Sequence, residues 1–390
     1  MKKPISTRIA GLDTLRALAI LAVMAFHLSW RLPERLMPVA RFGWMGVDLF
    51  FVLSGYLIGS QLLRPVSRRQ EISLIEFYRK RAYRILPAYL VVLGLYLLWP
   101  AWHEDKAMSP LWQFLTFTEN LFVDYSKNHA FSHVWSLCVE EHFYLVLPLL
   151  VLWLSRRPAL WKTVSVLLFF VVLGVAMRSY ELVHVLRPLD TNGDEFSTRY
   201  IERIYYPTYS RLDGLLAGVA LALIRIFRPA WWSAIARRAN WLLLAGCALV
   251  GGCVYLFFNR FSSDTGPAAV GIVIGYPLLS LGLAFLVVAA IETRSWLGRV
   301  RVPGAKLLAT LAFSLYLTHK EIARLDSLYW HHLAQARDWR SVLLLGVTCV
   351  AGAAILYLCV ERPFLALRDH REKRVPVSSV DEEARLEPAL

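Results

Sequence analysis

Long apolar runs separated by short polar stretches recur along the whole chain. A helix needs about 20 apolar residues to cross the hydrocarbon core of a bilayer. Proline and paired arginines, as in Arg64-Pro-Val-Ser-Arg-Arg and Arg228-Pro, punctuate the runs and are typical of helix ends at the membrane surface. The pattern predicts an all-α integral membrane protein with ten spans, at residues 12–30, 43–63, 85–102, 133–154, 160–177, 212–227, 240–258, 268–291, 306–325 and 341–360.

The composition agrees with this fold class. Of the 390 residues, 57% are hydrophobic and 18% are charged, so the chain is more apolar and less charged than a typical soluble domain. The formal net charge of +14 would by itself also suit a protein that binds nucleic acid. The basic residues, however, form short clusters between apolar runs and are not interleaved with exposed aromatics on a polar surface. We therefore expect the lipid bilayer, and not nucleic acid, as a partner.

The basic residues also predict an orientation. If the N-terminus is cytoplasmic, Lys and Arg are more frequent in the cytoplasmic segments than in the outer ones, and the segment 64–84 contributes most. Such an excess is characteristic of cytoplasmic loops. The sequence therefore predicts both termini in the cytoplasm, one transmembrane domain over residues 1–370, and a polar, disordered cytoplasmic tail over residues 371–390.

Ionisable side chains inside the predicted spans form the candidate site, because such groups are costly at membrane depth and usually functional. Arg16 and His27 lie eleven residues apart on the first span. This spacing places them on one helix face, separated by about 16 Å along the axis. Arg16 is then near the cytoplasmic surface and His27 near the outer one.

Three further spans bring ionisable groups to the level of His27. Asp48, Glu140 and Glu141 lie on spans that enter from outside, and His319 lies near the outer end of the ninth span. Glu140 and Glu141 are consecutive and point about 100° apart, so we expect one of them to face His27. For Asp48 an alternative is the role of counter-ion to an arginine such as Arg41 or Arg211.

A basic cluster precedes the third span, where Arg81 and Arg84 share a helix face. Such clusters can serve topology or lipid headgroups alone, but arginine also binds phosphate with two parallel hydrogen bonds. With Arg16 at similar depth, these side chains could hold a phosphate-rich ligand. Coenzyme A fits this layout, because it joins a phosphorylated nucleotide to a long arm that ends in a thioester.

Signatures of soluble enzymes are absent from the sequence. We find no GxSxG, GxxxxGK[ST] or HExxH motif, and the five cysteines lack the spacing of a zinc site. No metal is therefore expected.

Seven motifs in order resemble the membrane acyltransferase-3 family of bacteria. They are Gly11-Leu-Asp-Thr-Leu-Arg-Ala-Leu-Ala with His27, Gly46-Val-Asp-Leu-Phe-Phe-Val-Leu-Ser-Gly, Phe77-Tyr-Arg-Lys-Arg-Ala-Tyr-Arg-Ile-Leu-Pro, Trp135-Ser-Leu-Cys-Val-Glu-Glu-His-Phe-Tyr, Arg211-Leu-Asp-Gly-Leu-Leu-Ala-Gly, Ser314-Leu-Tyr-Leu-Thr-His and Glu361-Arg-Pro-Phe. One detail departs from the family pattern, since His142 stands where Gln is usual, and this puts the role of that position in doubt. Few residues remain outside the resemblance, so we expect no fused SGNH domain of the kind that some members carry.

The resemblance implies a chemistry. It implies ten transmembrane helices in the bacterial cytoplasmic (inner) membrane, acyl-CoA as the donor, often acetyl-CoA, and O-acylation of a glycan or lipid-linked sugar at the outer face. Family residues implicated in activity correspond to Arg16, His27, Arg81 and Arg84, and the carboxylate of the Trp-Ser-Leu motif corresponds to Glu140.

These considerations lead to a hypothesis. His27 acts as general base on an acceptor hydroxyl, oriented by Glu140 or Asp48, or accepts the acyl group itself. The CoA phosphates are held by Arg16, Arg81 and Arg84, and acceptor contacts are expected from Glu141, Tyr144, Arg211, Asp213 and His319. Alternatives are acylation of a small secreted metabolite such as an antibiotic, and transport of an anionic metabolite.

Overall fold

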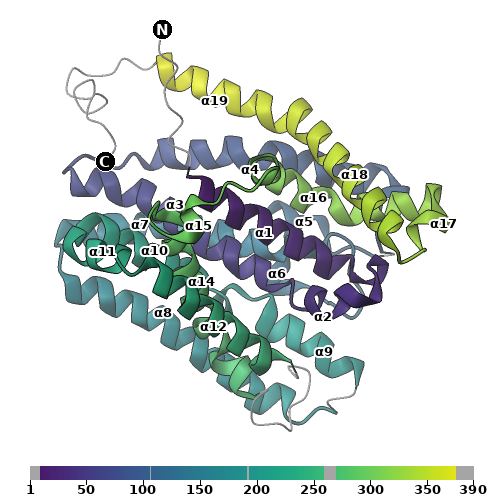
Figure 1. Ribbon diagram of the computed structural model, residues 1–390, viewed down its shortest axis with the longest axis horizontal. Coiled ribbons are helices and arrows are strands. Elements are labelled where there is room, and N and C mark those ends of the chain that lie inside the picture. Colours follow the sequence, from purple (N-terminus) through teal and green to yellow (C-terminus); the bar gives the residue numbers. More distant parts are fainter. Residues whose placement is uncertain (1–8, 106, 191–192, 259–268, 375–390) are drawn as a thin grey trace.

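The computed structural model describes residues 9–105, 107–190, 193–258 and 269–374 (Figure 1). Within these ranges the chain is helical and forms no strand, so the predicted all-α class is confirmed. The long helices are α1 (Ala10–His27), α3 (Met45–Ser67), α4 (Leu74–Leu98), α7 (Trp135–Arg156), α8 (Leu160–Glu181), α10 (Asp213–Phe227), α12 (Ala239–Phe257), α14 (Tyr276–Ile291), α16 (Ala305–Tyr329), α18 (Trp339–Leu356) and α19 (Arg362–Arg374).

Short helices connect the long ones. They are α2 (Met37–Ala40), α5 (Leu111–Leu115), α6 (Glu119–Phe122), α9 (Asp194–Tyr200), α11 (Pro229–Ala236), α15 (Trp296–Arg299) and α17 (His331–Ala334). Wider π-helical turns follow α8 and α9, precede α14, and join α18 to α19, at Leu182–Leu186, Ile201–Tyr205, Gly271–Gly275 and Tyr357–Glu361.

Every predicted span falls on a helix. Among the described residues, eight helices are long and apolar enough to cross a membrane, and nine if α10 and α11, bent by 112°, count as one span. The ninth predicted span, 306–325, lies on the 25-residue helix α16, which is not one of these. Its sequence explains the difference, because Lys320 and Glu321 are charged residues in its middle.

Local sequence signals set several helix starts. The Ser73 side chain accepts a hydrogen bond from the Glu76 backbone amide, and Asp338 caps α18 in the same way. Gly304 precedes α16 with φ of 80°, a left-handed conformation that glycine adopts without strain. The Ser73 cap also corrects a prediction, because α4 begins at Leu74 and the basic cluster lies on the helix itself and not before it.

Close helix contacts form the centre of the bundle. Helix α3 is largely buried and packs against α10, α1 and α14. A Cβ atom on Gly55 would lie 2.0 Å from the Leu215 carbonyl oxygen, and one on Gly218 would lie 2.2 Å from that of Val52. Small residues allow such approach between membrane helices. Helix α8, in contrast, has few buried residues and forms part of the outer wall.

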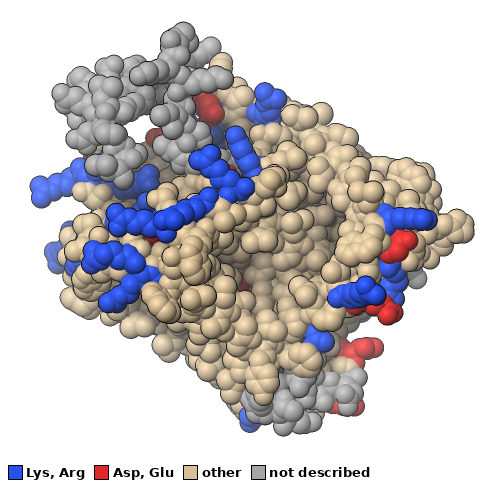
Figure 2. Space-filling model, viewed as in Figure 1, with Lys and Arg blue, Asp and Glu red and all other residues tan. Residues whose placement is uncertain are grey.

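Charged residues separate to the two ends of the bundle. Figure 2 shows Lys and Arg gathered at the left end, where α1 begins and α19 ends in Figure 1, whereas Asp and Glu accompany the basic residues at the right end. An uneven distribution of Lys and Arg is what the topology rule describes. The cytoplasmic location of the termini stays a prediction. Of the predicted tail, residues 371–374 belong to α19, and the remainder lies outside the described residues.

The contact between α3 and α10 leads to a stability prediction. Gly55→Ala should lower the free energy of unfolding by roughly 1–3 kcal/mol, because the added methyl group meets backbone that cannot move aside. The measurement is thermal unfolding in detergent. Gly94→Ala on α4 is the matched control, since nothing lies within 4 Å of its Cβ position and alanine favours the helix. Equal melting temperatures for Gly55→Ala and wild type would contradict the packing.

Candidate active site

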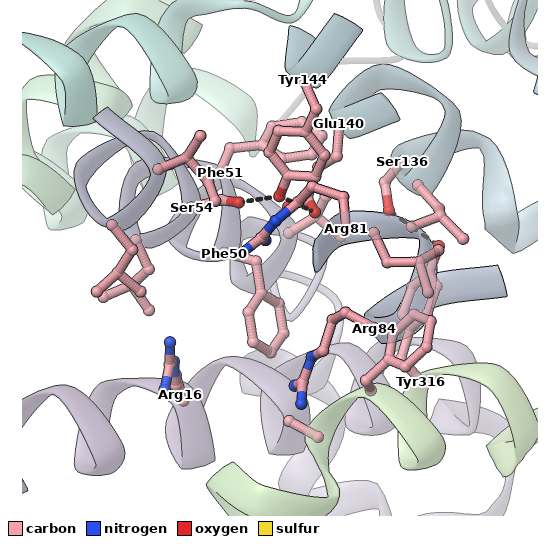
Figure 3. A pocket seen from close by; sticks show the side chains of 18 of the residues that line it. Arg16, Phe50, Phe51, Ser54, Arg81, Arg84, Ser136, Glu140, Tyr144 and Tyr316 are labelled. Carbon is pink, nitrogen blue, oxygen red and sulfur yellow. Dashed lines mark hydrogen bonds between the residues drawn. The ribbon is translucent and has the colours of Figure 1, made fainter. Parts of the chain in front are cut away.

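A cavity of about 540 Å³ opens between α1, α3, α4, α7, α16 and α19. Its volume is within the usual range for a small-molecule site. Arg16, Arg81, Arg84 and Arg368 line it, and we call it the arginine cavity. Figure 3 shows the first three side chains reaching into the space from α1 and α4. The structure thus brings together the three arginines that the sequence singled out.

The arginines of α4 are held by neighbouring polar groups. Arg81 donates from Nη2 to Gln61 Oε1 over 3.4 Å, and its guanidinium lies 5.6 Å from the centre of the Tyr144 ring. The Nε of Arg81 is buried without a hydrogen-bond partner among the described residues. Arg84 forms a 2.8 Å ion pair with Glu361. These contacts orient both guanidinium groups and leave some of their N–H donors for an anion.

Hydroxyl groups and one carboxylate form another part of the wall. The Tyr144 hydroxyl donates to Glu140 Oε2 over 2.8 Å and also contacts Ser54 Oγ (Figure 3). Ser136 and Tyr316 are joined at 2.9 Å. Glu140 is therefore the member of the glutamate pair that lines the cavity. Glu141 is half-buried, and its Oε1 has no hydrogen-bond partner in the part of the chain that the structure describes.

Three histidines meet beyond the inner wall of the cavity, and we call them the histidine cluster: His27, His133 and His319. Nδ1 of His27 lies 2.8 Å from Nε2 of His319, with the rings stacked at an interplanar angle of 17°. The His133 ring centre lies 6.1 Å from that of His27. It also lies 5.4 Å from the ring centre of Tyr316, which lines the arginine cavity. One aromatic side chain thus separates the cluster from the cavity.

An acidic group lies on the far side of the histidine cluster. Glu104 pairs with Lys320 at 2.7 Å. Burial favours the neutral carboxyl, but the Lys320 ammonium outweighs it and lowers the pKa of Glu104 below its usual value. The Tyr96 hydroxyl lies 2.5 Å from Glu104 and also contacts Glu321. Since that hydroxyl has one hydrogen, one of the two carboxyl groups must carry a proton of its own.

The same acidic group has the spacing of a metal site. Ligand atoms of Glu104, His133 and Glu321 lie within 4.8 Å of one another. The Tyr96 hydroxyl, however, already bridges the two carboxyl groups, and Lys320 neutralises Glu104. We therefore assign no metal to these residues.

Ion pairs inside the bundle account for three predicted site residues. Arg211 Nη2 lies 2.8 Å from Asp48 Oδ1, which confirms the alternative role of Asp48 as a counter-ion. Asp213 pairs with Arg178 at 2.7 Å. All four side chains are buried. The geometry therefore does not support the expected acceptor contacts of Arg211 and Asp213, because each of these side chains is buried and paired with a charged group of the core.

The predicted partner of His27 is also corrected. Its ring bonds to His319, whereas Asp48 bonds to Arg211 and Glu140 bonds to Tyr144. The physical reason is the position of each residue along the helical segment that contains His133 and Glu140. His133 lies beside His27, and Glu140 lies seven residues further on, about 10 Å along a helix.

Several residues of the site were not predicted from the sequence. Lys320 and Glu321 fall inside the predicted span 306–325, so the rule that marks intramembrane charges could have found them. His133 is the first residue of the predicted span 133–154, so the same rule could have found it as well. Arg368 lies beyond the last predicted span and offered no such signal, and only the packing of α19 brings it to the site.

Comparison with known proteins agrees with these features. A family model described as an acyltransferase domain matches residues 9–360. The chain is 27% identical over 372 residues to the peptidoglycan O-acetyltransferase OatA of Listeria monocytogenes, covering 91% of this chain and 55% of that protein. It is 31% identical over 230 residues to the O-acetyltransferase OatA of Staphylococcus aureus, covering 55% of this chain and 34% of that protein.

The chain spans about half the length of the Listeria relative and a smaller share of the Staphylococcus one. No solved structure matches it. The family model nevertheless covers most of the chain, and six of the seven motifs lie within the matched residues, with Glu361-Arg-Pro-Phe directly after them. This protein belongs to the membrane acyltransferase-3 family.

Proposed function

We propose that this protein transfers an acyl group, in particular acetyl, from cytoplasmic acyl-CoA to a hydroxyl of a cell-surface or lipid-linked glycan. The observation that carries the proposal is the connection between the arginine cavity and the histidine cluster. Arg16 and His27 lie on α1, and Tyr316 and His319 lie on α16, so the same two helices contribute to both places.

The arginine cavity suits the donor. Coenzyme A carries a diphosphate and a ribose phosphate, and arginine forks bind phosphate oxygens with paired, charge-assisted hydrogen bonds. Four arginines and a single carboxylate, Glu140, are the charged residues that line the cavity. The arm of coenzyme A would then extend along α1, whose rise of 1.5 Å per residue separates Arg16 from His27 by about 16 Å.

The histidine cluster suits the transfer step. His27 is half-buried, whereas His133 and His319 are 2% and 0% exposed. In the proposed reaction His27 accepts the proton of the acceptor hydroxyl as its oxygen attacks the thioester carbonyl. The tetrahedral intermediate then expels the CoA thiolate, which takes the proton from His27. An acyl-His27 intermediate is the second route, and trapping labelled enzyme after acyl-CoA alone would favour it.

The acceptor is proposed from the relatives. Both named relatives are O-acetyltransferases, and the name of the Listeria protein specifies peptidoglycan. A glycan hydroxyl at the outer face of the bacterial cytoplasmic membrane is therefore the proposed acceptor. A small secreted metabolite is the other acceptor that the assay below distinguishes.

His27→Ala should abolish transfer. We expect purified wild-type protein to release free CoA and to label an extract of host surface glycans, with the rate reduced about 10²–10⁴-fold in the variant because the base is lost. His184→Ala, at an exposed position, is the control. Near-normal transfer by correctly inserted His27→Ala would refute the assignment. Counterflow of a labelled anion without covalent change would instead favour a transporter.

Arg81→Lys should raise the KM for acyl-CoA about tenfold. Lysine keeps the charge but loses the fork, and one charge-assisted hydrogen bond contributes roughly 1.5–3 kcal/mol. The check is steady-state kinetics with varied acyl-CoA, with the exposed Arg64→Lys on α3 as control. If KM is unchanged while the orientation in the membrane changes, the arginine serves topology and not donor binding.

Arg368→Gln tests whether α19 contributes to the donor site. The Arg368 side chain lines the cavity from outside the family match, which ends at residue 360. Loss of its charge should raise the KM for acyl-CoA by roughly 3- to 10-fold with kcat retained, because a half-buried cation contributes less than a fully buried one. Binding of acyl-CoA measured by calorimetry provides the check. Equal affinity in both proteins would exclude Arg368 from the site.

A further inference from the structure

The backbone of α16 determines the tautomer of His319. Its Nδ1 lies 2.9 Å from the Leu315 carbonyl oxygen and 3.0 Å from that of Tyr316. A carbonyl oxygen can only accept, so Nδ1 must carry the hydrogen. The His319 side chain is fully buried, and a second proton would place an additional charge there. Its Nε2 is therefore an unprotonated acceptor.

The tautomer of His27 follows from that of His319. Nδ1 of His27 lies 2.8 Å from this acceptor, so Nδ1 must be the donor of the hydrogen bond. A neutral imidazole carries one hydrogen, and Nε2 of His27 consequently bears the lone pair. His27 is also the member of the histidine cluster that keeps partial exposure. The nitrogen able to accept a proton thus belongs to the partly exposed ring of the cluster.

We infer that His319 is the positioning residue for His27, holding it as the Nδ1–H tautomer with Nε2 free to act. This inference rests on the proposed function and replaces the expected acceptor contact of His319. In Ser-His-Asp triads an aspartate has the corresponding task. Here a neutral imidazole performs it, which avoids burying another carboxylate beside Glu104 and Glu321.

The proton balance of the reaction agrees with this role. The acceptor hydroxyl gives its proton to Nε2 of His27, and the Nδ1–H of the resulting imidazolium stays hydrogen-bonded to His319. The proton on Nε2 then passes to the departing CoA thiolate, so His319 begins and ends the cycle in one protonation state. If His27 is acylated instead, Nε2 attacks the thioester as the nucleophile and the CoA thiolate leaves. The acceptor hydroxyl then takes the acyl group from Nε2 and gives its proton to that thiolate, so the same tautomer is required.

Two substitutions at one position test the inference. His319→Gln keeps a side-chain oxygen that can accept from Nδ1 of His27, whereas His319→Leu provides no acceptor. We expect His319→Leu to lower kcat at least about 10²-fold with the KM for acyl-CoA unchanged, because the arginine cavity is intact. His319→Gln should stay within about tenfold of wild type. Thermal unfolding in detergent checks that both variants are folded.

A readout that does not need activity separates this inference from the proposed function. Ring ¹⁵N shifts of labelled histidine distinguish the two tautomers, and the His27→Gln protein identifies the His27 signals. We expect the Nδ1–H form in wild type and His319→Gln, and its loss in His319→Leu. An Nε2–H form in wild type, or equal kcat in His319→Leu and wild type, would overturn the inference. Absence of acyl transfer by wild type would overturn the proposed function alone.

Discussion

A charged side chain buried in a bundle of apolar helices is tolerated only when another group satisfies it. The core obeys this constraint through two ion pairs, between Arg211 and Asp48 and between Arg178 and Asp213. Asp213 connects the start of α10 to α8, and Arg211, in the turn just before α10, connects it to α3, so electrostatic satisfaction and helix packing reinforce one another. Arg81 differs from these pairs, because the contacts of its half-buried guanidinium are with neutral groups, a long hydrogen bond to the Gln61 amide oxygen and the Tyr144 ring. Because Arg81 lines the arginine cavity, an anionic ligand bound there would supply the negative partner of its guanidinium.

The two functional regions are related by rigid helices and not by a mobile connection. Helix α1 carries Arg16 and His27 on one face, and α16 carries Tyr316 and His319 one turn apart. An α-helix keeps its rise per residue, so the axial separation between Arg16 and His27 on α1 is fixed. A donor held by its phosphates would therefore present its thioester at a constant depth. Under the proposed function, a preorganised protein site would thus act on one long, flexible donor.

The histidine cluster illustrates how a buried site can orient a base without a further charge. A carboxylate partner for His27 would have to be desolvated close to Glu104 and Glu321, which already share a proton through Tyr96. A second imidazole makes the same hydrogen bond while remaining neutral. Backbone carbonyl groups of α16 determine its protonation, and these groups cannot titrate. The tautomer of His27 is thus a consequence of helix geometry.

Hydropathy alone determined the class of this protein and the position of most spans to within a few residues, because the bilayer demands apolar runs of a particular length. It missed the start of α4 at Leu74, and it counted α16, whose charged residues exclude it from the apolar helices that could span the membrane. Helical periodicity likewise placed Arg16 with His27, and Arg81 with Arg84, on common faces. The partners of Asp48 and His27 were decided only by the tertiary structure. They depend on the rotation and axial shift of one helix against another, which glycine contacts such as that of Gly55 with Leu215 determine at the scale of single atoms. The hydropathy of a sequence window contains no such information. If one helix were shifted along its neighbour by two turns, the hydropathy of both would be unchanged, but His27 would face a different partner.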